Sequence, residues 1–147
     1  MTLELLPFTL ELAHTFGISR ERYDSQETLI TALSQEGHTG YGEATANPYY
    51  GITTTSMQKE IEALRKDLEA FPGGSPEDFE ALLRDSDLSY FARCALDMAY
   101  NDLFGKKAGK PLYELWGTLP GALPVRHYPI GLDLLEVMVD KMQEKPW

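Results

Sequence analysis

The chain has few of the residues from which function is most often inferred. Its 147 residues include one cysteine and three histidines, and 13 lysines and arginines stand against 23 aspartates and glutamates, for a formal net charge of −10. A single cysteine excludes an internal disulfide. The shortage of clustered positive charge argues against a nucleic-acid partner. No apolar run approaches the roughly 20 residues that span a bilayer, so we expect no membrane partner.

The N-terminus also lacks the marks of a secretory signal. It reads MTLELLPFTLEL, in which acidic residues stand in place of the basic ones of a signal peptide and the pattern alternates as in a strand. We therefore expect a cytoplasmic protein. A hydrophobic content of 43% indicates a globular chain with a buried core.

Residues able to hold a metal or to act as nucleophiles do not gather into a pattern. A Mg²⁺ site needs carboxylate oxygens that converge from several elements, whereas Asp97 and Asp102 fall on one expected helix and Glu43 stands alone. The histidines are far apart, and none has a second ligand at metal-binding spacing: His14, His38 and His127. Taken alone, the residues predict no catalytic residue and no metal site in this chain.

Three N-terminal segments predict an antiparallel meander. Residues 2–14 alternate loosely, 27–35 carry apolar residues among threonines, and 39–44 follow a glycine-bearing turn at 36–40.

Two helices are expected after this sheet. Thr55 and Gln58 have capping-box spacing and open a helix whose apolar seam consists of Met57, Ile61, Leu64, Leu68 and Phe71. Ser75 is expected to cap a second helix that has Pro76 in its first turn.

The stretch 92–117 predicts a further helix with an unusual face. Small and apolar residues recur at three- and four-residue spacing, which lets another backbone approach closely: Ala92, Ala95, Leu96, Ala99 and Leu103. Cys94 lies on the same helix and is expected to be a buried small hydrophobe instead of a nucleophile.

Charge and glycine mark the end of this helix. Asp102 and Lys106 stand at i and i+4 in the favourable order. Gly105 and Gly109 are expected to break the helix, and Pro111 to stand in the first turn of a short one.

Residues beyond 117 predict the start of a second unit. A Gly- and Pro-rich crossing at 117–124 leads to a short strand at 125–131. A helix follows, on which four residues are expected to face one way: Leu134, Leu135, Met138 and Met142. A strand followed by one helix is half of a βαβ unit, whose strand needs a parallel neighbour.

Several of these segments together resemble a known family. ALDMAYNDLFGK at 95–106 and GKPLYELWG at 109–117 are similar to the end of the capping domain in the mandelate racemase and muconate lactonizing branch of the enolase superfamily. Further segments narrow the resemblance to dipeptide epimerases: GYGEA at 40–44, YYGIT at 49–53, IGLD at 130–133 and KMQEKPW at 141–147.

The resemblance implies an α+β fold in two parts. Residues 1–117 would form an enolase-like N-terminal capping domain, a three-stranded antiparallel meander followed by a helical bundle. Residues 118–147 would form a linker and the first βα unit of a truncated (β/α)8-type barrel. The parent would be an isomerase in which a lysine removes a proton α to a carboxylate while Mg²⁺ stabilises the enediolate. Since those groups lie on later barrel strands, we expect this chain alone to be inactive and to bind no Mg²⁺.

The resemblance also implies a small-molecule substrate, a dipeptide or N-acylated amino acid, and a homo-oligomeric parent. Two capping-domain loops would close over the barrel mouth and exclude water. They match residues 14–20 and 47–53, whose candidate substrate-binding residues are Phe16, Ile18, Arg20, Tyr49, Tyr50 and Ile52. Arg22 is an alternative to Arg20 as the partner of a substrate carboxylate. Alternatively, these apolar side chains only pack at the hairpin end and over the helix start.

The same sequence features are also compatible with other functions. A cycloisomerase of the muconate or o-succinylbenzoate type, or an acid-sugar dehydratase, would use a similar capping domain, because fold does not fix substrate. A stand-alone, non-catalytic α+β binding domain is the alternative from a different class.

Overall fold

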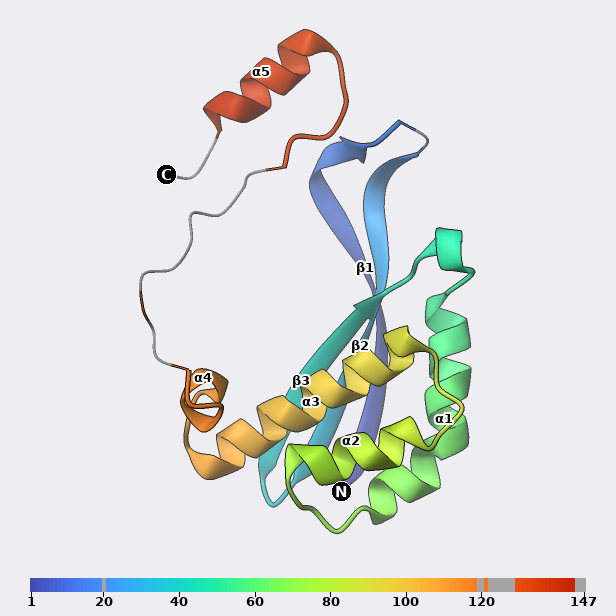
Figure 1. Cartoon of the computed structure of the whole chain (residues 1–147). Coiled ribbons are helices and arrows are strands. Elements are labelled where there is room, and N and C mark those ends of the chain that lie inside the picture. The colour runs from blue at the N-terminus through green and yellow to red at the C-terminus, as the bar shows by residue number, and fades with distance from the viewer. Residues whose placement is uncertain (20, 119–120, 122–128, 145–147) are drawn as a thin grey trace. The chain divides into compact units, whose positions relative to one another are not determined.

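The computed structural model describes residues 1–19, 21–118, 121 and 129–144 (Figure 1). The chain divides into two compact units. Unit 1 comprises Met1–Phe8 with Glu27–Leu119, and unit 2 comprises Thr9–Gln26 with Pro120–Trp147.

A three-stranded sheet begins the chain, in the order β1-β2-β3. Its strands are β1 (Thr2–Gly17), β2 (Arg22–Gln35) and β3 (His38–Thr45). Glu36 and Gly37, with φ of 52° and 78°, form a two-residue turn, and Gln35 pairs with His38 across it. The predicted meander is confirmed. The turn predicted at 36–40 is too long, because β3 already begins at His38.

Helices follow the sheet in unit 1. They are the short 3-10 helix η1 (Pro48–Tyr50), α1 (Thr54–Ala70), α2 (Pro76–Arg84), α3 (Tyr90–Ala108) and α4 (Leu112–Leu115). Ser75 caps α2 and Pro76 is its first residue, as predicted. The cap predicted at Thr55 is wrong: Thr53 caps α1, in a reciprocal capping box with Ser56 that leaves Thr55 inside the helix.

Helix α3 packs against β3 at backbone distance, as its small-residue face predicted (Figure 1). A Cβ added to Gly42 would lie 1.9 Å from the Ala95 carbonyl oxygen, and one added to Gly40 would lie 2.2 Å from that of Ala99. The buried Thr31 hydroxyl donates to the Ala95 carbonyl oxygen at 2.8 Å. Glycines on the strand and alanines on the helix together allow this close approach.

The end of α3 differs in part from its prediction. Lys106 pairs with Asp102 at 2.7 Å, as expected. Gly105 does not break the helix; it is buried within α3, where the Lys110 carbonyl oxygen and Leu112 leave little room for a Cβ. Gly109 ends the helix in the left-handed conformation, with φ of 64°. Pro111 caps α4 instead of standing in its first turn.

The core of unit 1 lies between the sheet and the helices. It contains Leu29 and Leu33 of the sheet together with the buried faces of α1, α2 and α3. Phe79 stacks on Tyr100 with ring centroids 4.1 Å apart, and Phe71 meets both rings edge-on. The Tyr100 hydroxyl donates to the Gly74 carbonyl oxygen at 3.0 Å, so the loop before α2 is fixed to α3.

Unit 2 contains the end of the β1–β2 hairpin and the helix α5 (Leu135–Gln143). Residues 125–128 of the predicted barrel strand lie outside the described residues, and 129–131 are not in a strand. The helix is confirmed, but most of its predicted apolar residues are not buried and Met138 is half-buried. Leu134, Leu135 and Met142 are exposed, whereas Lys141 is buried. None of the described helices is long and apolar enough to cross a membrane.

Candidate functional site

The segment Asn47–Thr53 in unit 1 is a closed, ordered turn. The backbone N–H groups of Asn47 and Ile52 donate to each other's carbonyl oxygens at 2.9 and 3.0 Å. The Asn47 side chain accepts from the Tyr49 N–H at 3.1 Å, and Gly51 completes the turn with φ of 68°. The sequence suggests a loop here, and the structure shows that its backbone is closed by hydrogen bonds.

Two tyrosines project from this turn. Tyr49 is 79% exposed and Tyr50 65% exposed, and their rings meet edge-on with centroids 4.9 Å apart. Tyr50 also lies 5.9 Å from the ring of Phe91 on α3. Ile52 is half-buried and packs against the core. The turn therefore anchors itself through Ile52 and presents Tyr49 and Tyr50 outward.

The other candidate segment lies in unit 2. Residues 14–17 belong to β1 and not to a loop, so the predicted loop 14–20 is shorter than expected. Phe16 and Ile18 are both exposed, and the Ile18 N–H donates to the Glu21 carbonyl oxygen at 2.9 Å across the turn. Arg20 lies outside the described residues. Two exposed apolar side chains thus stand at the end of a hairpin.

Arg22 has a protein partner in unit 2. Its guanidinium donates to Asp133 Oδ1 at 3.0 Å. The Leu134 N–H donates to the same oxygen at 2.9 Å, and Lys141 Nζ lies 3.4 Å from Oδ2. The Leu134 N–H and then the Arg22 guanidinium hold the pKa of Asp133 below its usual range. Sequence reasoning assigned Asp133 and Lys141 no role. Arg22 and Asp133 are 111 positions apart, so their pairing gives no local pattern.

An apolar groove in unit 1 was also missed. It has a volume of about 480 Å³ and lies between the end of β3 and the first half of α3, lined by Glu43, Ala44, Thr45, Tyr90, Phe91, Cys94 and Met98. Cys94 is exposed here, so its predicted burial is wrong. It lies outside the alanine stripe that meets β3, and its Sγ is 3.8 Å from Met98 Sδ.

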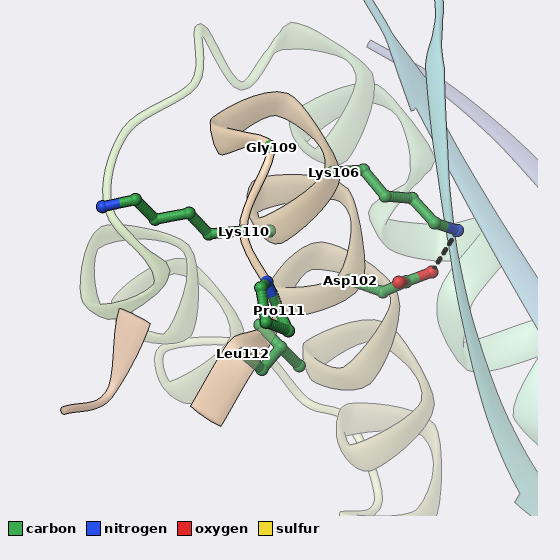
Figure 2. Close-up of a pocket in the computed structure, with 7 residues that line it drawn as sticks. Asp102, Lys106, Gly109, Lys110, Pro111 and Leu112 are labelled. Atoms are coloured by element: carbon green, nitrogen blue, oxygen red, sulfur yellow. Dashed lines mark hydrogen bonds and ion pairs between the residues drawn. The ribbon is translucent and has the colours of Figure 1, made fainter. Parts of the chain in front are cut away.

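A second pocket surrounds the C-terminal end of α3 (Figure 2). Lys106 reaches Asp102 and the Thr39 carbonyl oxygen, at 2.7 and 2.8 Å. Lys110 points away from that pair in Figure 2. The two lysines therefore do not converge on one ligand position, and the pocket reflects how α3 ends.

The described residues contain no group of three or more acidic, His or Cys side chains that could hold a metal ion. Asp102 accepts from Lys106 and from the Tyr41 N–H. Asp97 interacts with Asn101, and burial, followed by the nearby Glu80 charge, raises the pKa of Asp97. These carboxylates do not fit a Mg²⁺ site.

Comparison with known proteins accounts for this architecture. Residues 7–117 match the family described as mandelate racemase / muconate lactonizing enzyme, N-terminal domain. The chain belongs to this family. Its fold is therefore that of the enolase-type N-terminal capping domain, and the resemblance identified from the sequence is confirmed.

Curated relatives in the family are named epimerases. The L-Ala-D/L-amino acid epimerase of Maribacter is 54% identical over 147 residues, and that of Flavobacterium johnsoniae is 46% identical over 150 residues. Each alignment covers 100% of this chain but only 44% of the relative. The chain thus spans less than half the length of these proteins.

Solved structures with a similar fold include a dipeptide epimerase and a protein homologous to such enzymes, and the chain again covers less than half of each. An enolase family member from Agrobacterium tumefaciens with homology to dipeptide epimerases, with bound sodium and L-Ala-L-Glu, has a TM-score of 0.80 and 26% identity, covering 97% of this chain and 42% of that one. The dipeptide epimerase of Enterococcus faecalis, complexed with Mg and L-Leu-L-Tyr, has a TM-score of 0.76 and 26% identity, covering 95% and 40%.

Proposed function

We propose that this chain is the substrate-specificity capping domain of a Mg²⁺-dependent dipeptide epimerase. In this proposal residues 1–117 are the capping domain, and 118–147 are the linker and first strand and helix of a barrel. The residues that remove and return the α proton, and those that hold Mg²⁺, belong to the rest of a longer, cytoplasmic, homo-oligomeric enzyme. The substrate is a dipeptide or an N-acylated amino acid.

The observation that carries this proposal is the tyrosine pair on the 47–53 turn. Large apolar side chains that are exposed on a hydrogen-bonded backbone are arranged to contact something outside their own unit. Epimerases are also the curated relatives at 54% and 46% identity over the whole chain. Tyr49 and Tyr50 would supply an apolar wall for a substrate side chain, with Phe16 and Ile18 of unit 2 in the same role.

Such a wall acts on catalysis without touching the reacting atoms. Apolar side chains over a reaction site exclude water, which strengthens the electrostatic interactions inside it. They also discriminate between substrates by the apolar surface each one buries. Ile52 supports the turn from the core, and Arg20 is proposed as the partner of a substrate carboxylate, since Arg22 is already engaged by Asp133.

The test uses Tyr50→Ala in the longer protein, with Tyr113→Ala, an exposed tyrosine of α4, as the matched control. We expect Tyr50→Ala to lower kcat/KM for L-Ala dipeptides by roughly 10 to 200-fold, the range for lost apolar contact in a pocket. Its free energy of unfolding should change by less than about 0.5 kcal/mol, because the side chain is exposed. An unchanged kcat/KM in folded Tyr50→Ala would contradict the proposal.

A second measurement separates the capping role from intrinsic activity. The chain alone, incubated with Mg²⁺ and L-Ala dipeptides in deuterated water, should exchange no α hydrogen by NMR. Exchange above a metal-free blank would show that the catalytic groups lie within these 147 residues. Turnover of a cyclisable diacid or an acid sugar by the longer protein, without dipeptide epimerisation, would instead favour a cycloisomerase or a dehydratase.

A further inference from the structure

The hairpin end that carries Phe16 is held on both sides of that residue. The Thr15 carbonyl oxygen accepts from Lys141 Nζ at 3.2 Å. The Gly17 carbonyl oxygen accepts from the Leu132 N–H at 2.7 Å. A Cβ on Gly17 would lie 2.5 Å from the Leu132 carbonyl oxygen, so this approach requires glycine. The backbone around Phe16 is therefore attached to the 132–141 segment, while its ring is exposed.

Asp133 contacts the side chains of both Arg22 and Lys141, which connect the hairpin to the 132–141 segment. Its Oδ1 accepts from Arg22, on the returning strand of the hairpin, and its Oδ2 lies 3.4 Å from Lys141 Nζ. The Asp133 side chain is 13% exposed and that of Lys141 is 8% exposed. Charged groups this far removed from water interact more strongly than surface pairs, and removing one leaves the other unpaired.

We propose that Asp133 is a positioning residue for the segment Phe16–Ile18. Through Lys141 it fixes the strand that leads into the segment, and through Arg22 it fixes the strand that leaves it. Substrate contact by Phe16 and Ile18 rests on the function proposed above; the positioning itself does not. Asp133 touches no reacting atom in this role.

Hydrogen exchange on the chain tests the positioning directly. In Asp133→Asn, an NH₂ group stands where an oxygen faces Lys141, and the charge is lost. We expect the Ile18 and Leu132 amides to exchange about 10-fold faster, the effect of losing one charge-assisted hydrogen bond. The Met57 amide, which bonds the Thr53 carbonyl oxygen in unit 1, should keep its rate. Asp87→Asn, at an exposed aspartate between α2 and α3, is the control.

Two outcomes would overturn the proposal. One is an Asp133→Asn variant in which the Ile18 and Leu132 amides keep their rates. The other is acceleration of every slow amide alike, which a merely structural role would produce. If Asp133→Asn does not fold, Arg22→Gln replaces it, since the Arg22 side chain is 60% exposed. Arg22→Gln should accelerate the Ile18 amide, Arg22→Lys should largely restore its rate, and unchanged exchange in Arg22→Gln would equally overturn the proposal.

Kinetics of the longer protein distinguish the two proposals. We expect Asp133→Asn to raise KM for an L-Ala dipeptide by about 10-fold while kcat falls less, because uniform binding is lost. Faster exchange at Ile18 with unchanged KM would uphold positioning by Asp133 and remove Phe16 and Ile18 from the substrate wall. A raised KM with unchanged exchange would overturn positioning by Asp133.

Discussion

Helices α3 and α5 differ in what they bury, although both were predicted from apolar residues at helical spacing. On α3 the predicted face is fully buried, with Ala95, Leu96 and Ala99 inaccessible to solvent. On α5 the buried residue is Lys141, at 6% exposed, whereas Leu135 is 78% exposed. Periodicity thus predicted both helices, but the apolar residues at helical spacing are buried on only one of them.

The difference lies in what each helix meets. The α3 face finds glycines on β3, and its small side chains allow contact at backbone distance. On α5 the buried residue is instead charged: the Lys141 ammonium meets a carbonyl oxygen and a carboxylate of its own unit, while Val137 and Met138 are only half-buried. A buried charge is retained where it is paired and hydrogen-bonded, so polar contacts can attach a helix whose apolar residues are not fully buried.

Truncation of one leucine on each helix should give the largest contrast. Leu96→Ala removes a fully buried side chain and should cost about 2–5 kcal/mol in the free energy of unfolding. Leu135→Ala removes an exposed one and should cost less than about 0.5 kcal/mol. Urea unfolding of the two variants measures both values. Equal losses would mean that Leu135 is buried in solution, and the contrast between the helices would fail.

The close contact between α3 and β3 predicts that Gly42→Ala lowers the free energy of unfolding, but by less than Leu96→Ala does. Gly42→Ala places a Cβ 1.9 Å from the Ala95 carbonyl oxygen, so strand and helix must separate. We expect a cost of about 1–3 kcal/mol in thermal or urea unfolding, as for an overpacked core. Gly121→Ala is the control, because a Cβ there meets nothing within 4 Å. A neutral Gly42→Ala would show that the sheet and α3 yield easily to separation.

Local signals predicted most of unit 1. The cap predicted at Thr55 was a local error, because Thr53 and Ser56 have the same spacing, and other failures occurred where a distant contact decides the outcome. The cap at Ser75 and the helical end at Gly109 depend on a few neighbouring residues and were correct.

Gly40 and Gly105 were read as turn and breaker residues, since sequence alone cannot distinguish a glycine needed for its φ from one needed for its missing side chain. The pairing of Asp133 with Arg22 was missed because the two residues lie 111 positions apart in the sequence.

The charge network of unit 2 should weaken as pH falls. The Leu134 N–H and then Arg22 lower the pKa of Asp133, so its carboxylate is favoured in the folded state. That stabilisation is present above the unfolded pKa of about 3.9 and is lost as pH falls through the lower folded value. The Leu132 amide should therefore exchange faster in Asp133→Asn than in the original chain at pH 6, and the ratio should approach one only as pH falls through the lowered folded pKa of Asp133. A ratio independent of pH would exclude the ionised carboxylate as its cause.

The smallest predicted effect on stability concerns Asp97 of α3, whose pKa is shifted upward, whereas that of Asp133 is shifted downward. Burial raises the pKa of Asp97, so the folded state favours its protonated form. The resulting stabilisation is present below the unfolded pKa of about 3.9 and is lost as pH rises through the folded value, which leaves a penalty at pH 7.

Asp97→Asn removes the charge while an amide oxygen can still accept from Asn101. We expect a gain of under about 0.5 kcal/mol at pH 7, since the carboxyl is only partly buried and solvent screens its charge. The gain should shrink toward pH 4. Asp67→Asn, at an exposed aspartate of α1, should show no such gain, and a loss of stability in Asp97→Asn at pH 7 would mean that its interaction with Asn101 outweighs the cost of burial.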